Sequence, residues 1–140
     1  MRSWLPPVLL LVIAAVPMLL LPTPGSLDVR FYYSGAQARA FLTGLSAAQA
    51  HTYLLHEWWD LLFIAAYSWI FVKLLRTRWA LLPGALDFVE TTMIIGALSG
   101  TAVAPLGVIT ALKWFTAPLM LILGLRKRFL AAKAAPVNIR

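Results

Sequence analysis

Residues 106–125 read LGVITALKWFTAPLMLILGL, and this run of 20 residues contains a single charged side chain, Lys113. A helix needs about 20 mostly apolar residues to cross the hydrocarbon core of a bilayer. Residues 4–21, 53–72 and 79–98 have similar length and apolar character, although the second and third of these stretches contain acidic residues. The sequence therefore predicts an all-α fold: a four-helix transmembrane bundle that forms a single membrane domain over residues 1–140.

The composition supports a membrane protein and excludes several other classes. Hydrophobic residues make up 61% of the 140 residues, charged residues make up 12%, and the mean hydropathy is +0.83. A soluble domain of this size buries only about two-thirds of its surface, so water would not tolerate so much apolar surface. These values exclude an ordinary soluble enzyme, a disordered chain and a nucleic-acid-binding module. The chain has no cysteine, which excludes disulfides, thiolate metal sites and cysteine chemistry.

The basic residues predict the orientation in the membrane. Arg2 precedes the first stretch, and a basic tail over residues 126–140 follows the fourth. The link between the second and third stretches contains Lys73, Arg76 and Arg78. Basic residues concentrate on the cytoplasmic side of membrane proteins, so both termini are expected to be cytoplasmic. The first stretch is expected to stay as an anchor, because no small-residue cleavage site follows Pro22.

Residues 22–50 form the predicted outer loop, and two capping boxes within it predict helix starts. Ser34 with Gln37, and Ser46 with Gln49, have the spacing in which each side chain bonds the other residue's backbone N–H. The first box predicts a short helix over residues 35–43, whose apolar face is expected to carry Ala36, Ala40 and Phe41. The second box predicts a helix that continues into the second span, over roughly 30 residues or about 45 Å.

Charged residues inside the predicted spans are the most informative feature. The chain has five acidic residues, and four of them lie within spans: Glu57, Asp60, Asp87 and Glu90. A charge at the centre of a bilayer costs about 2.5–3.5 kcal/mol, so such residues usually face protein or water and have a function. Each acidic pair has a spacing of three, which places its members on one helical face. Tyr67 lies on the same face as Asp60, seven residues further along.

The helix rise places Asp60, Glu90 and Lys113 at similar depths, about 10–13 Å below the outer boundary. We expect Lys113 to pair with Glu90 or Asp60, and Asp87, which lies deeper, to be a protonated carboxyl and a candidate catalytic acid. Tyr67 and Trp114 would line the apolar part of the same site. Three further residues are expected to contribute to this site from its outer face, namely Tyr33, His56 and Glu57. No metal or cofactor is expected, since His51 and His56 do not share a helical face.

A pattern of single residues along the chain resembles that of a family of small uncharacterised bacterial four-span membrane proteins. These residues run as Asp60-x-x-Phe63-x-x-x-Tyr67 in span two, Asp87-x-x-Glu90 in span three, and Leu112-Lys113-Trp114 in span four. The resemblance implies that Asp60, Tyr67, Asp87, Glu90 and Lys113 form one site, in a bacterial inner membrane. It assigns no activity. The chain has Ile64 where the family has proline and Thr91 where it has asparagine, so the resemblance implies neither a kink in span two nor an amide in the cluster.

The function classes that remain differ in the state they require of this charge cluster. As an accessory subunit of a larger membrane complex, the protein would use a dry, fully paired cluster to fix the bundle. As a ligand-binding protein, it would hold the polar head of a lipid-like molecule in a cavity open to the outer leaflet. A membrane-embedded enzyme acting on a lipid-like substrate and a proton-coupled carrier working as a homodimer are the alternatives. Gly96 and Gly100 form a GxxxG motif that favours close helix contact.

Overall fold

The computed structural model describes residues 3–23, 25–27, 30–101 and 106–134, except for the side chains of 127, 128 and 131–134. Its elements in chain order are α1 (Leu5–Leu20), α2 (Gly35–Thr43), α3 (Ala47–Leu75), the short 3-10 helix η1 (Arg78–Leu81), α4 (Leu82–Leu98) and α5 (Leu106–Ala134). The described residues contain helices and no strands, which confirms the all-α class. The predictions for Arg2 and for residues 135–140 lie outside the described residues.

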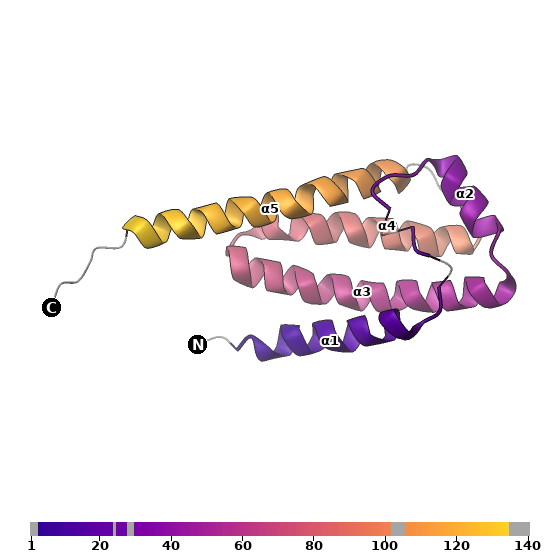
Figure 1. Ribbon diagram of the computed structural model, residues 1–140, viewed down its shortest axis with the longest axis horizontal. Coiled ribbons are helices and arrows are strands. Elements are labelled where there is room, and N and C mark those ends of the chain that lie inside the picture. Colours follow the sequence, from indigo (N-terminus) through magenta and orange to yellow (C-terminus); the bar gives the residue numbers. More distant parts are fainter. Residues whose placement is uncertain (1–2, 24, 28–29, 102–105, 135–140) are drawn as a thin grey trace.

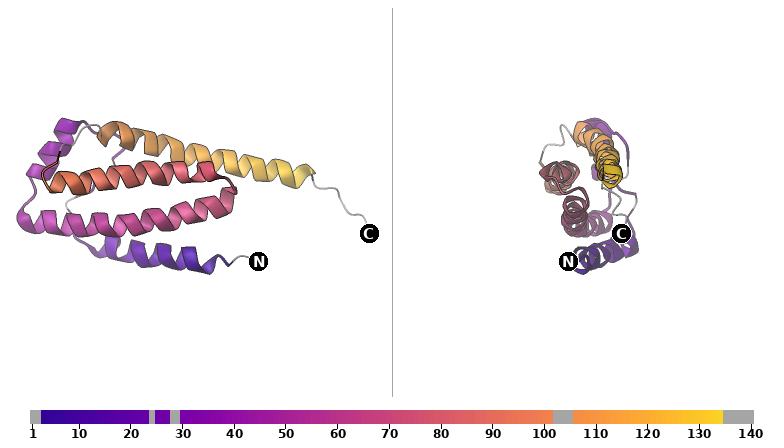
Figure 2. Two further views of the ribbon diagram at one scale, coloured as in Figure 1. Left: turned by 180° about the vertical axis from the view of Figure 1, so that it is seen from behind. Right: turned by 90° about the vertical axis from the view of Figure 1, so that its left-hand side faces the viewer.

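Three helices are long and apolar enough to cross a membrane: Ala47–Leu75, Arg78–Leu98 and Leu106–Arg126. The helix α1 is apolar but shorter, with 16 residues. Seen along the helix axes in Figure 2, α3, α4 and α5 pack around one another, and α1 lies against the far side of α3. The structure is therefore a three-helix core with α1 attached to one of its members.

The two ends of the molecule are formed by different parts of the helices. The start of α1, the end of α3, the start of α4 and the end of α5 all lie at one end, and α2 crosses the opposite end (Figure 1). The helix α5 extends beyond α3 and α4 at the first end. The helix α5 continues past Leu125, the predicted end of the fourth span, into the basic sequence that follows. Residues 126–134 are strong helix formers without proline or glycine, so the helix continues to Ala134.

Both predicted capping boxes are present. The Ser34 hydroxyl accepts from the Gln37 N–H at 3.2 Å, and the Gln37 side chain accepts from the Ser34 N–H at 2.8 Å. Ser46 and Gln49 repeat the arrangement at the start of α3. The buried face of α2 differs from the prediction, because Ala38 is buried while Ala36 and Ala40 are exposed. Phe41, which was predicted correctly, is partly buried against the core.

An apolar cluster closes the end of the molecule that α2 crosses. Its buried members are Leu27, Tyr33, Ala38, Tyr53, Ile94 and Leu106. The Tyr53 hydroxyl on α3 accepts a hydrogen bond from the Leu27 N–H at 3.0 Å, which holds the chain after α1 against the core. The loop between α1 and α2 is thus folded onto the helices, and it brings Tyr33 next to α4 and α5.

The GxxxG motif does not mediate helix contact. The helix α4 ends at Leu98, so only Gly96 is helical, and Gly100 has a left-handed φ of +93°. The Thr101 N–H bonds the Gly96 carbonyl and the Gly100 N–H bonds the Ala97 carbonyl, as in a Schellman helix stop. A left-handed residue is required there, and glycine adopts that conformation without strain. The motif therefore terminates α4.

Candidate functional site

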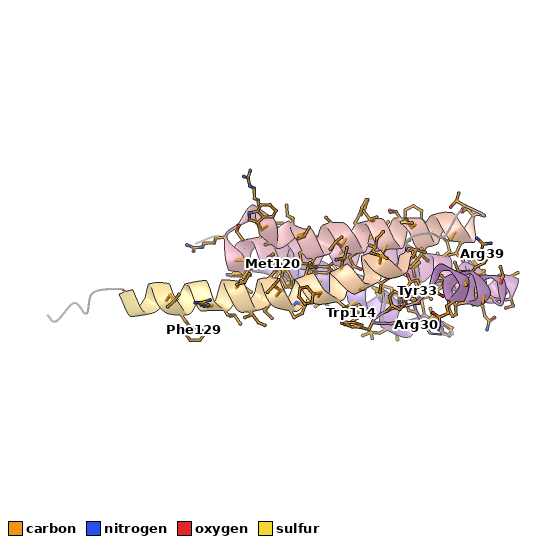
Figure 3. The ribbon with its side chains drawn as sticks, turned by 90° about the horizontal axis from the view of Figure 1, so that it is seen from above. Arg30, Tyr33, Arg39, Trp114, Met120 and Phe129 are labelled. Carbon is orange, nitrogen blue, oxygen red and sulfur yellow. The ribbon has the colours of Figure 1, made fainter. Side chains whose placement is uncertain are left out.

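One buried polar cluster connects α3, α4, α5 and the loop before α2. We call it the Lys113 cluster, and it consists of Tyr33, Tyr67, Asp87, Glu90, Thr110 and Lys113. Its charged members are almost wholly buried, with Glu90 0% exposed and Asp87 and Lys113 each 9% exposed. In Figure 3 Tyr33 lies beside the first turns of α5, on the half of that helix that also bears Trp114.

The centre of the cluster is the ammonium group of Lys113 on α5. Its Nζ atom lies 2.7 Å from Asp87 Oδ1 and 2.6 Å from Glu90 Oε2, both on α4. The two carboxylates reach one ammonium because their spacing of three places them on one face of α4. Lys113 thus pairs with Glu90 as predicted. Asp87, which we expected to lie deeper and to be a protonated carboxyl, contacts the ammonium group directly.

The other carboxylate oxygens of this pair accept hydrogen bonds from hydroxyl groups. The Tyr67 hydroxyl on α3 donates to Asp87 Oδ2 at 2.7 Å. The Tyr33 hydroxyl donates to Glu90 Oε1 at 2.9 Å, and the Thr110 hydroxyl donates to the same oxygen. Each of the four oxygens of Asp87 and Glu90 therefore contacts a polar group of the protein.

Asp60 joins the site from α3 through a hydroxyl of α4. The Thr91 hydroxyl donates to Asp60 Oδ2 at 2.8 Å, and both residues are buried. Thr91 follows Glu90 directly, so the bond connects Asp60 to the helix that holds the two paired carboxylates. Thr91 therefore supplies a hydroxyl donor to the buried carboxylate of Asp60. Ile64 lies within an α3 that is continuous from Ala47 to Leu75.

The three outer-face residues have different positions. Tyr33 belongs to the Lys113 cluster itself, through its bond to Glu90. Glu57 is fully buried, and its Oε1 atom lies 3.9 Å from Nδ1 of His56. The His56 ring stacks on Tyr53, with ring centroids 6.3 Å apart. His56 and Glu57 thus lie along the α3 face that leads towards the apolar end cluster.

Trp114 borders the Lys113 cluster on the exposed side of α5. The Lys113 ammonium lies 5.9 Å from the centroid of the Trp114 ring, which is within range of a cation–π contact. The Trp114 side chain is 40% exposed. It shields one side of the ammonium group and presents the rest of its ring outwards.

Sequence reasoning missed Thr110 altogether and noticed Thr91 only as a departure from a family pattern. The signal for Thr110 is its spacing of three from Lys113, which places both side chains on one face of α5. The signal for Thr91 is its place beside Glu90, on the buried side of α4. A hydroxyl residue beside a charged residue of an apolar helix, or one turn from it, is thus the pattern that finds both.

The donor set can neutralise carboxylates and hold helices together, but it is not arranged for a metal. Among the described residues no group of three or more His, Asp or Glu side chains has the geometry to hold a metal ion. The acidic side chains instead accept hydrogen bonds from separate donors, which lie on α3, α4, α5 and the loop before α2. No family model, curated protein or solved structure matches this chain significantly.

Proposed function

We propose that this chain is a small four-span membrane protein with both termini in the cytoplasm, and that it serves as a structural accessory subunit. The Lys113 cluster would fix the relative positions of α3, α4 and α5. The apolar outer faces of the helices would then meet lipid or a larger membrane partner. The observation that carries this proposal is that all four oxygens of Asp87 and Glu90 contact polar groups of the protein.

The arrangement of α1 supports its assignment as the fourth span. It lies alongside α3, the longest candidate span, and exposes large apolar side chains such as Leu9, Val12 and Ile13. A 16-residue helix is about 24 Å long, which is shorter than an average hydrocarbon core. Local thinning of the bilayer accommodates such a helix at modest cost.

The charge distribution supports the orientation. Lys73, Arg76 and Arg78 lie at the same end of the molecule as the extended end of α5, which begins its basic sequence at Arg126. This end would be cytoplasmic by the positive-inside rule. The described acidic residues lie along α3 and α4 in the Lys113 cluster and its extension to Glu57.

A structural cluster differs from a binding cluster in its energetics. When a buried ion pair loses one partner, an uncompensated charge remains and stability falls by about 3–5 kcal/mol. Removing all the charges together leaves none uncompensated. Residues kept to bind a ligand would instead leave the stability of the empty protein unchanged or raise it when they are replaced.

The test is thermal unfolding of detergent-purified variants. We expect Lys113→Met to destabilise strongly, because two buried carboxylates then lack their cation. The triple variant Lys113→Met, Asp87→Asn, Glu90→Gln should recover most of that loss. Arg126→Met serves as the matched control on the same helix, since Arg126 is exposed. Unchanged stability in the Lys113 variant would contradict the structural role and favour a lipid-like ligand at this cluster.

Topology has an independent test, because a chain without cysteine gives a clean background for single-cysteine labelling. Arg39→Cys on α2 and Arg78→Cys between α3 and α4 are exposed positions at opposite ends of the molecule. In intact cells an impermeant maleimide should label the first and not the second, and disrupting the membrane should expose both. The reverse pattern would overturn the proposed orientation.

A further inference from the structure

A pocket lies between the first turn of α1 and the last turns of α3, and none of its lining residues belongs to the Lys113 cluster. Its volume is about 1000 Å³, and its lining residues are Ser3, Trp4, Pro6, Trp69, Val72, Lys73 and Arg76. It lies at the end of the molecule where the chain carries Lys73, Arg76 and Arg78. If that end faces the cytoplasm, the pocket opens at the inner membrane interface.

Lys73 is held in place at this pocket by aromatic rings. Its Nζ atom lies 5.3 Å from the centroid of the Trp4 ring and 5.7 Å from that of Trp69, and it donates to the Ser3 carbonyl oxygen. These contacts orient the ammonium group and join α1 to α3. An ammonium has three N–H donors, and the Ser3 carbonyl accepts from one of them. The group therefore has further donors for an acceptor in the pocket.

Arg76 adds a second cation one turn further along. It ends α3 in the left-handed conformation, with a φ of +51°, and its side chain is exposed. Among the described residues that line the pocket there are two cations and no carboxylate. The nearest acidic residue along α3 is Asp60, 13 residues and about 20 Å from Lys73. The two cations of this pocket therefore have no carboxylate among the lining residues beside them.

The remaining lining residues define the kind of anion. Pro6, Val72 and the two tryptophan rings form an apolar wall, which continues into the exposed apolar surfaces of α1 and α3. Tryptophan favours the interface between headgroups and acyl chains. Basic pockets between membrane helices on the cytoplasmic side suit anionic lipid headgroups. A molecule with a phosphate beside an acyl chain can contact both the cations and the apolar wall of the pocket.

We propose that the groove between α1 and α3 binds one anionic phospholipid from the inner leaflet, with its phosphate at Lys73 and Arg76 and its acyl chain along α1 and α3. This inference rests on the membrane orientation proposed above. The bound lipid would reinforce the contact of α1, which packs mainly on α3. The shared recognition chemistry is that of a phosphate monoanion, so the test must separate a lipid from free phosphate.

The experiment measures the unfolding temperature of delipidated protein in an uncharged detergent. Added phosphatidylglycerol should raise it by several degrees, whereas phosphatidylcholine and inorganic phosphate should not. Arg76→Asn should lose at least half of the phosphatidylglycerol effect, and asparagine tolerates the left-handed conformation at this position. Lys73→Gln should lose a larger part of the phosphatidylglycerol effect than Arg76→Asn does. Arg78→Gln is the matched control, because it removes an exposed cation of the same end that does not line the pocket.

Each other outcome overturns the inference. An equal loss in Arg78→Gln would show a general surface attraction, and full protection by phosphate alone would show an anion site without a lipid. Equal protection by phosphatidylcholine would show that the net negative charge of the lipid headgroup is irrelevant. Lys73→Gln alone is a weaker test because Lys73 also tethers α1, so an unimpaired response of Arg76→Asn counts against the site. If the Lys113 variants and the labelling behave as proposed while phosphatidylglycerol has no effect, the lipid site alone is wrong.

Discussion

The backbone of Tyr33 passes so close to Gly107 that a Cβ atom on residue 107 would lie 1.6 Å from the Tyr33 carbonyl oxygen. Gly107 is in the first turn of α5, and Tyr33 is in the loop before α2. The same loop position delivers the Tyr33 hydroxyl to Glu90 at 2.9 Å. The missing side chain of Gly107 therefore determines whether the loop before α2 reaches the Lys113 cluster.

Gly107→Ala is expected to destabilise the protein, because the new methyl group meets a backbone oxygen that cannot move to another rotamer. Overpacking of this kind costs about 1–3 kcal/mol. The displacement should also break the bond between Tyr33 and Glu90. Urea or thermal unfolding in detergent measures the loss of stability.

Tyr33→Phe provides the comparison, since it removes the hydroxyl and leaves the backbone in place. A hydrogen bond to a charged group contributes about 1.5–3 kcal/mol. In the double variant the two losses should sum to more than the measured loss, because Gly107→Ala has already separated the hydroxyl from Glu90. Strict additivity would show that the loop holds Tyr33 independently of Gly107.

Thr91→Val is expected to lower stability by about 1–3 kcal/mol, because it keeps the shape of the side chain and leaves the buried Asp60 without that donor. Thr91→Ser should keep most of the stability of the unaltered protein, because serine keeps the hydroxyl that donates to Asp60. Thr92→Val is the matched control on the neighbouring residue, whose hydroxyl bonds the carbonyls of Phe88 and Val89 in its own helix. A loss for Thr92→Val as large as that for Thr91→Val would contradict a specific role for the bond to Asp60.

The sequence predicted the local features of the fold well, because they depend on residues close together in the chain. The short helix over 35–43 and the long helix that starts after Ser46 followed from serine and glutamine three residues apart. The predicted spans at 79–98 and 106–125 begin or end close to the observed helices for the same reason, since hydropathy is a property of a short window. The helix α5 extends to Ala134, nine residues past the predicted span, because a membrane boundary does not require a helix boundary.

The pairing within the candidate site depends on how each helix is rotated, and a single sequence does not contain that information. Depth along the helix axis predicted that Asp60, Glu90 and Lys113 lie at one level, yet Lys113 contacts Asp87 as well as Glu90. A long lysine side chain spans one turn, so a difference in depth of about 5 Å did not separate the two. The contribution of Tyr33 to the cluster was unpredictable in detail, because it depends on a loop contact with Gly107.

Ser46→Ala is expected to loosen the first turn of α3 and lower stability by about 0.5–2 kcal/mol. Ser46→Asp should keep the cap, since aspartate accepts the same backbone N–H bond. Amide hydrogen exchange is the measurement, and Gln49, whose N–H bonds Ser46, should exchange faster in the alanine variant. Faster exchange in the aspartate variant as well would show that the turn is held by other contacts.

Ala38→Asp should destabilise α2 and the apolar end cluster, because it places a carboxylate at a position that is 0% exposed. An unpaired charge in such a site costs several kcal/mol. Ala36→Asp is the matched control, since residue 36 is exposed and an acidic side chain near a helix N-terminus is slightly favourable. Thermal unfolding should therefore separate two identical substitutions that lie two residues apart. Similar losses in the two variants would mean that α2 does not pack on the bundle through Ala38, and the apolar face predicted from Ala36 and Ala40 would regain support.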